Sequence, residues 1–180
     1  MKKKHPTIGC CGIDCGLCPR FYTEGSSRCP GCGGEGFELV RPPCSFKTCC
    51  ADKHSLEACG GCAEYPCAKY ENREKIGRDS FVTHERMFYN HEQIKKHGID
   101  SFTAKQSKRV SLLENMLADF DAGRSKSYYC LAATLLPVES LEAAIAEASS
   151  EKDIKGKAKA LKAVLRKYAE AEGVVLALIK

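Results

Sequence analysis

The spacing of apolar residues changes near residue 70 of the chain. Before this point no apolar run keeps a period of either 2 or 3.6 residues, and Gly and Pro pairs interrupt the segment. Beyond it the chain is rich in Ala, Leu, Lys and Glu, with stop signals at intervals that suit helices. The pattern predicts a loop-rich module over residues 1–70 and an α-helical domain over residues 71–180, a mainly α fold with minor β structure.

Five helices are predicted in the second domain from caps, stop signals and apolar spacing. Their expected bounds are about Ser80 to Lys96 (capped by Asp79 or Ser80, ended by Gly98), Asp100 to the stop at Gly123, Tyr128 to Leu135, Val138 to Ala148, and Glu151 to Glu172. The core-facing positions expected in the second and last of these are Phe102, Gln106, Val110, Leu113, Leu117 and Phe120, then Ile154, Ala158, Leu161, Leu165 and Tyr168. The apolar run at residues 174–179 fits a terminal strand or a frayed helix end.

Cysteine is distributed unevenly, and this changes the picture of the first module. Of the 13 cysteines, 12 lie between Cys10 and Cys67. No apolar run follows the first lysines, so the sequence predicts neither a secretory leader nor a membrane span, and hence a cytoplasmic protein. In a reducing cytosol, clustered thiols are expected to bind metal rather than to form disulfides.

The first predicted metal site combines two Cys-x-x-Cys knuckles. Cys15 with Cys18, and Cys29 with Cys32, each point two sulfurs toward one ion, and ten residues separate the knuckles. We therefore expect these four thiolates to share one metal, as in a zinc knuckle or ribbon.

The second predicted site has one knuckle and two more distant ligands. Cys59 and Cys62 form the knuckle, Cys67 follows, and Cys49 is the upstream candidate. Cys44 and Cys50 compete for that upstream place, with His54 as a further alternative.

Zinc is the expected metal, with two ions in structural sites, because closed tetrathiolate sites leave no position open for substrate. Each such site supplies on the order of 10 kcal/mol of folding free energy. An iron-sulfur cluster is the alternative, since it also uses four thiolates and both Cys18 and Cys29 precede proline. The spacing of Cys11, Cys15 and Cys18 matches radical enzymes, but the chain is too short for their barrel.

These segments resemble a prokaryotic cysteine-rich family known as domain of unknown function 3795. The similar segments are Cys11-Gly-Ile-Asp-Cys15-Gly-Leu-Cys18-Pro, Cys29-Pro-Gly-Cys32, Cys44 with Cys49, Cys59-Gly-Gly-Cys62 to Tyr-Pro-Cys67, and Gly123-Arg-Ser-Lys-Ser-Tyr-Tyr-Cys130-Leu-Ala. The resemblance implies a metal-binding protein without an established activity. It implies ten cysteines in the pattern, with Cys10 and Cys50 outside it. Cys11 and Cys44 then become replacement ligands, or thiols beside the metal.

Charge gives a weaker indication of partners. The chain carries 28 basic and 23 acidic residues, a net charge of +5, which two zinc tetrathiolates would lower to about +1. Seven basic residues between Lys152 and Lys167 are the best local case for nucleic acid, but no aromatic side chains interleave with them. A metal-binding protein that contacts an unidentified macromolecule is therefore expected, with an iron-sulfur or thiol-based redox enzyme as the alternative.

Three further side chains are candidates for chemistry. Cys130 follows a basic turn and could be a nucleophile, but a buried thiol among leucines is the preferred interpretation. His84 and His91 are expected two turns apart on one helix, most simply as packed, hydrogen-bonded residues.

Overall fold

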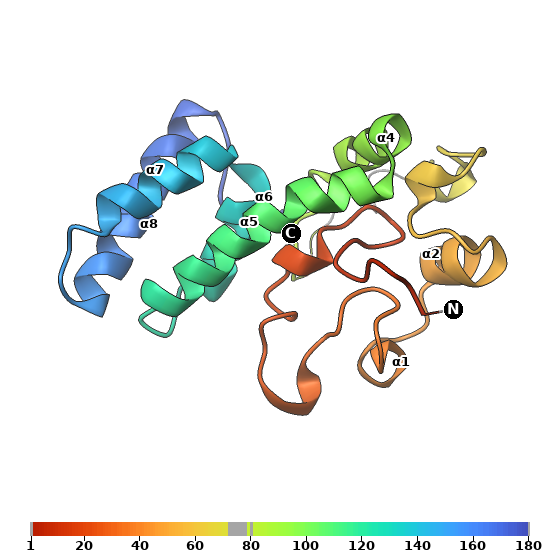
Figure 1. Cartoon of the computed structure of the whole chain (residues 1–180), viewed down its shortest axis with the longest axis horizontal. Helices are drawn as coiled ribbons and strands as arrows, with labels where there is room; N and C mark the ends of the chain where they lie inside the picture. The colour runs from red at the N-terminus through yellow and green to blue at the C-terminus, as the bar shows by residue number, and fades with distance from the viewer. Residues whose placement is uncertain (1, 72–78, 80, 180) are drawn as a thin grey trace. The chain divides into compact units, whose positions relative to one another are not determined.

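The fold of the described residues is mainly helical. The structure is a computed structural model, and it describes residues 2–71, 79 and 81–179 (Figure 1). Across these residues no β-strand is present, so the predicted minor β structure is wrong. The α-helices are α1 (Phe37–Val40), α2 (Ser45–Lys47), α4 (Met87–His97), α5 (Ile99–Asp119), α6 (Lys126–Leu135), α7 (Val138–Ala148) and α8 (Ile154–Ala171).

The chain divides into two compact units. Unit 1 contains Met1–Gln106 with Leu178–Lys180, and unit 2 contains Ser107–Ala177. The predicted boundary after residue 70 adjoins residues 72–78, which lie outside the described part. Unit 1 extends beyond the cysteine module because α4 packs against the short 3₁₀ turn at Cys59–Gly61.

Unit 1 is built from loops and single turns around a small core of cysteines and aromatic rings. Its central buried side chains include Tyr65, Tyr70 and Met87, together with the thiols described below. The Tyr70 ring packs edge-on against Tyr65 and Phe88, at centroid distances of 5.1 Å and 5.8 Å. Aromatic rings therefore supply the packing that the loop-rich segment lacks elsewhere.

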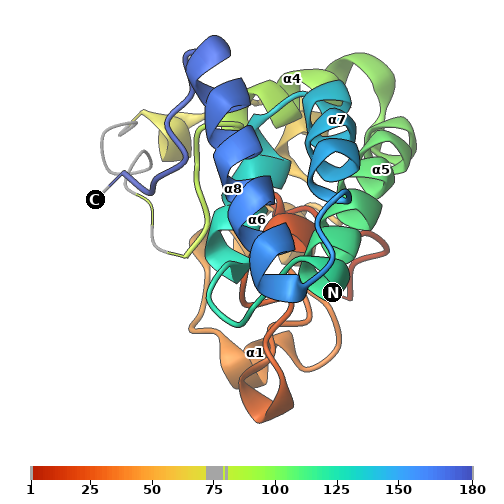
Figure 2. The same cartoon turned by 90° about the vertical axis from the view of Figure 1, so that its left-hand side faces the viewer.

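Unit 2 is a helical body in which α6, α7 and α8 pack together (Figure 2). Leu141 of α7 and both Leu161 and Leu165 of α8 are fully buried. Arg109 donates to the carbonyls of Ala133 and Leu136 at 2.7 Å and 2.6 Å, near the end of α6. This guanidinium satisfies carbonyl groups that a helix end otherwise leaves without a donor.

The later predicted helices agree with the structure. Helix α7 has the predicted bounds, and the ends of α6 and α8 lie within three residues of prediction. Helix α5 starts one residue early and ends at Asp119, four residues before the predicted stop at Gly123. Gly98 ends α4 as expected, with φ 80° and its N–H donating to Ile94. No helix of the described residues is long and apolar enough to cross a membrane.

The first predicted helix starts too early. Helix α4 begins at Met87, because the preceding segment is held as a loop by the Asp79 carboxylate. One Asp79 oxygen accepts the His84 N–H at 2.8 Å, and the other accepts the Ile179 N–H at 2.8 Å. Asp79 is therefore no helix cap, and the other proposed cap, Ser80, lies outside the described residues.

Two expectations near the C-terminus are wrong. Residues 174–179 form neither strand nor helix, since the Ala177 N–H turns back to the Val175 carbonyl at 2.9 Å. Ile154, expected in the core, is 43% exposed because it stands in the first turn of α8, directly after its cap.

Candidate metal centre

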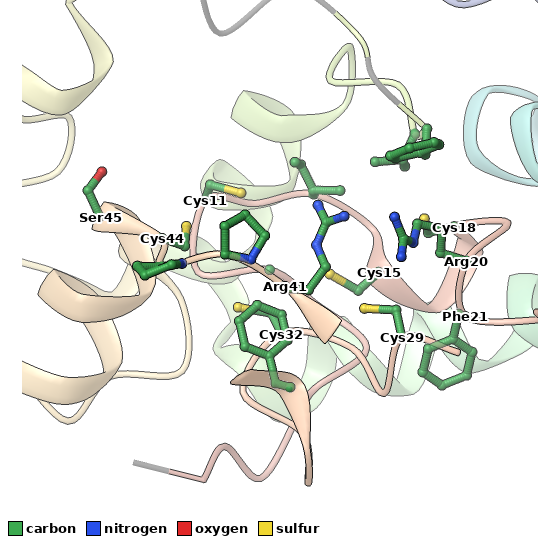
Figure 3. A pocket seen from close by; sticks show the side chains of 17 residues that line it. Cys11, Cys15, Cys18, Arg20, Phe21, Cys29, Cys32, Arg41, Cys44 and Ser45 are labelled. Atoms are coloured by element: carbon green, nitrogen blue, oxygen red, sulfur yellow. The ribbon is translucent and has the colours of Figure 1, made fainter. Parts of the chain in front are cut away.

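Six cysteine side chains line one cavity in unit 1. The cavity has a volume of about 430 Å³, and its sulfur-bearing walls come from three separate segments of the chain (Figure 3). Arg20 and Arg41 line it as well, with Phe21, Phe37 and Phe81 supplying apolar surface. The six cysteines are Cys11, Cys15, Cys18, Cys29, Cys32 and Cys44. A soft, cationic ligand is the chemistry that such a wall of thiols suits.

Backbone hydrogen bonds place the two predicted knuckles at this cavity. The Cys18 N–H donates to the Cys15 carbonyl at 3.2 Å, which closes the first turn. The Cys29 N–H donates to the Arg20 carbonyl at 2.9 Å, so the second knuckle lies against the chain that follows the first. Sequence spacing alone therefore anticipated that these two segments meet.

Burial favours the protonated form of three of the cavity thiols, those of Cys11, Cys15 and Cys18. Burial raises the pKa of Cys11 to about 12, and it raises the pKa of both Cys15 and Cys18. The positive charge of Arg41 acts against burial on the pKa of Cys18. A coordinating metal would displace these protons and supply the missing positive charge.

Four thiols form a second group, which we call the buried quartet: Cys10, Cys32, Cys50 and Cys59. The Cys32 and Cys10 sulfurs lie 3.7 Å apart, and the Cys10 N–H donates to the Cys32 sulfur at 3.5 Å. The Cys50 thiol donates to the Leu56 carbonyl at 3.4 Å, and Cys10, Cys50 and Cys59 belong to the same buried cluster. Exposed fractions of 1%, 7%, 3% and 9% largely exclude solvent from these four side chains.

Hydrogen bonding within the quartet lowers the pKa of two of its thiols. The bond from Cys32 lowers the pKa of Cys10 to about 3, and the bond from Cys50 lowers the pKa of Cys59. The donors respond oppositely, so the pKa of Cys32 and of Cys50 is raised. Lys3, itself 4% exposed, adds a positive charge that favours the Cys10 thiolate.

A buried hydrogen-bond chain leads from α4 to the quartet. The Gly60 N–H donates to His91 Nδ1 at 3.0 Å, so the proton of the neutral imidazole is on Nε2 and faces the Tyr70 hydroxyl at 2.9 Å. Burial lowers the pKa of His91 to about 4, which keeps this tautomer neutral. The Tyr70 hydroxyl is then free to donate to Cys59, and this contact contributes to the lowered pKa of that thiol.

The first predicted ligand set is brought to one place, with one difference. Cys15, Cys18, Cys29 and Cys32 all line the cavity, but the Cys32 sulfur contacts Cys10.

The second predicted set is divided between environments. Cys59 belongs to the buried quartet, whereas Cys49 lines a separate surface hollow of about 420 Å³ together with Cys44. Cys62 and Cys67 are half-buried and pack against the aromatic core of unit 1.

A single metal ion does not fit the side chains as they are arranged here. Within residues 2–71, 79 and 81–179, no three His, Cys, Asp or Glu side chains form a group that could hold one ion. Cysteine thiolates are suitable ligands for a metal. Their sulfur positions in the cavity fit a ligand larger than one ion, and a single ion could be bound only after the cysteine side chains rotate.

Comparisons with known proteins add no identity. No family profile, curated protein or solved structure matches this chain. The resemblance to domain of unknown function 3795 therefore stays a prediction.

Sequence reasoning missed the buried quartet. Cys10 and Cys50 were set aside as extra cysteines, yet each directly adjoins another cysteine, Cys11 or Cys49. Cys10 and Cys11 lie in a turn, and Cys49 and Cys50 lie in the helical turn Thr48–Lys53, so the two side chains of each pair leave the backbone in different directions and can face different surroundings. The adjacent pairs Cys10–Cys11 and Cys49–Cys50 were the feature of the sequence that could have indicated a second group of thiols.

The remaining candidates have structural explanations. Cys130 is 2% exposed within α6, as the packed interpretation predicted. His91 is a buried, hydrogen-bonded residue of α4, also as expected. His84 precedes α4 and pairs with Asp79 at 3.1 Å, so the prediction of two histidines on one helix is wrong.

Proposed function

We propose that this chain is a metal-binding protein whose unit 1 holds metal through thiolates of the cavity. Cys15, Cys18 and Cys29 are the ligands common to the sequence pattern and the cavity wall. Cys11 and Cys44 line the same cavity and can complete the set. The observation that carries the proposal is that six cysteines from three segments of the chain line one cavity.

Electrostatics supports a thiolate-bound metal. Four thiolates with one divalent ion carry a charge of −2, which needs nearby cations when it is half-buried. Arg20 and Arg41 line the cavity and supply them. The Arg20 guanidinium also stacks on Phe81, at 5.0 Å from the ring centroid, so its position is fixed beside the site.

The cavity volume favours an iron-sulfur cluster as its occupant. A cluster separates its four thiolates by iron and inorganic sulfide, and so needs a space, whereas zinc draws four sulfurs to about 2.3 Å from one point. The cavity has a volume of about 430 Å³, and no three Cys, His, Asp or Glu side chains of the described residues could hold one ion. These two facts suit an iron-sulfur cluster better than a single zinc ion. Zinc, the metal favoured by the knuckle spacing, is the second candidate and requires the thiols to rotate inward.

The two candidates imply different roles. A cluster makes unit 1 an electron-transfer or redox module, consistent with the thiol-based enzyme alternative. Zinc makes it a stabilising element for a surface that contacts another macromolecule. The exposed side chains of Lys155, Lys159 and Arg166 on α8 offer positive charge to an anionic partner in the second case.

Serine replacement of cavity cysteines tests the proposal. We expect the purified Cys18→Ser and Cys29→Ser proteins each to retain less metal per chain than the wild type, by the amount that the cavity holds. Cys130→Ser is the matched control, because Cys130 is buried in unit 2 and should leave metal content unchanged. The readout is elemental analysis beside far-ultraviolet circular dichroism. Unchanged metal in both cavity variants would contradict the proposal.

A further inference from the structure

We propose that one side of α8 binds the phosphate backbone of nucleic acid, without a preference for sequence. The surface consists of four basic side chains, which we call the basic row: Lys155, Lys159, Lys162 and Arg166. Residues three and four positions apart stand on the same side of an α-helix. The row lies within unit 2, so the proposal holds whether the cavity of unit 1 binds a cluster or zinc.

The charge of the basic row is not neutralised by the protein. From Ile154 to Ala169, helix α8 carries six basic residues and no acidic one. Among the described residues, no carboxylate forms an ion pair with a side chain of the row. Glu170, one turn beyond Arg166, is the single acidic residue of α8 and marks the end of the row. The positive charge is therefore available to an anionic ligand.

An aromatic side chain of α6 adjoins the row. The hydroxyl of the half-buried Tyr128 donates to the Lys162 carbonyl at 3.4 Å. Burial raises the pKa of Tyr128 and the positive charge of Arg166 acts against that rise, so the guanidinium is near the phenol as well. The order of the sequence hides this neighbour, because Tyr128 and Lys162 are 34 residues apart. Basic and aromatic side chains on one surface are the combination with which proteins hold nucleic acid.

The length of the row suits contacts with several phosphates. At 1.5 Å per residue, Lys155 and Arg166 are about 16 Å apart along the helix axis. A nucleic-acid duplex carries one negative charge per about 1.7 Å of its own axis. Four basic side chains over this length can therefore each contact a phosphate.

The remaining surface of α8 disfavours a membrane or a protein partner. Leu161 and Leu165 are fully buried, so the apolar side of the helix is not free to enter a lipid surface. Ile154 is exposed at the start of α8, but one isoleucine is too little for such an anchor. Next to the row the helix presents Ala160 and Ala163, and not the large apolar side chains of a protein interface. Nucleic-acid phosphates are the anionic partner that this surface fits.

Salt-dependent binding of a DNA duplex tests the surface. The probe is a fluorescein-labelled duplex of mixed sequence, titrated with the full chain and followed by fluorescence anisotropy. A plot of log affinity against log salt should have a slope of about −3 to −4, because each neutralised phosphate contributes about −0.9. Lys159→Gln combined with Lys162→Gln should make the slope shallower by about 2. No measurable binding at low salt, or an unchanged slope in this double variant, would overturn the proposal.

Lys95→Gln combined with Lys96→Gln is the matched control. It removes the same charge from exposed positions of α4 in unit 1, so we expect the slope to stay as in the wild type. Equal losses in the two double variants would show that net charge, and not the row, attracts the duplex, and would contradict the proposal. Circular dichroism checks that both proteins keep their helices, since glutamine is compatible with helix at all four positions.

Two further probes decide the class of ligand. A duplex of scrambled sequence should bind as tightly as the first, and a strong preference for one sequence would contradict backbone recognition. Vesicles of phosphatidylserine and phosphatidylcholine should bind more weakly than the duplex at the same salt. Binding to the vesicles without binding to the duplex would assign the row to a membrane surface and overturn the proposal. Failure of the cavity proposal appears separately, as unchanged metal content in Cys18→Ser and Cys29→Ser.

Discussion

Gly60 shows how single residues determine where the thiols lie. It is buried against the α4 backbone at His91, and its N–H donates to the His91 ring. A β-carbon at this position would stand 2.6 Å from the His91 carbonyl oxygen, which is backbone and cannot move aside easily. The close approach of the Cys59–Gly61 turn to α4 therefore requires glycine here, and with it the contact between Tyr70 and Cys59.

Replacing Gly60 by alanine should destabilise unit 1 by about 1–3 kcal/mol, because the methyl group overpacks the contact with α4. Gly61→Ala is the matched control. The next residue is exposed, and its β-carbon would meet nothing closer than 4.0 Å, so a change within about 0.5 kcal/mol is expected. Chemical denaturation followed by tyrosine fluorescence measures both. Equal stability of the two variants would show that the contact with α4 is not tight.

Residue-level sequence reasoning predicted that Cys15, Cys18, Cys29 and Cys32 lie near one another, but not which thiols contact each other. The knuckle at Cys15 and Cys18 is a local feature, so spacing was enough to predict it. The assignment of Cys32 and Cys59 was beyond reach, because their partners, Cys10 and Cys50, are distant in sequence and are brought together by tertiary folding.

Helix boundaries depend on whether the deciding contacts are local. Helix α8 starts where Asp153 accepts the N–H groups of Lys155 and Gly156, both at 3.0 Å, and α7 starts directly after Pro137. These signals are visible in the sequence, and the predictions came within three residues. Helix α4 starts late because of contacts between Asp79 and Ile179, one hundred residues apart, which no local pattern reports.

The cap of α8 gives a prediction at this scale. Asp153→Ala should destabilise unit 2 by about 1 kcal/mol, because two N–H groups of the first turn lose their acceptor. Asp153→Ser retains a capping oxygen and should recover most of the loss. Amide hydrogen exchange over the first turn of α8 measures the effect directly. Exchange as slow in Asp153→Ala as in the wild type would show that the cap contributes little.

At the scale of the molecule, the two units rely on different sources of stability. Unit 2 contains one of the 13 cysteines and buries a leucine-rich helical core. Unit 1 has short helices, many turns and a core in which thiols take the place of aliphatic side chains. A thiolate-bound metal contributes on the order of 10 kcal/mol to such a module, so metal should stabilise unit 1 far more than unit 2.

The most direct test is the metal content and absorption spectrum of the full chain, purified without air. The account predicts bound metal held by thiolates of the cavity, as iron with inorganic sulfide and visible absorption. Zinc alone, with no visible absorption, would reassign the cavity to a rotated tetrathiolate. A folded protein that contains neither iron nor zinc and binds neither on reconstitution would contradict the central claim.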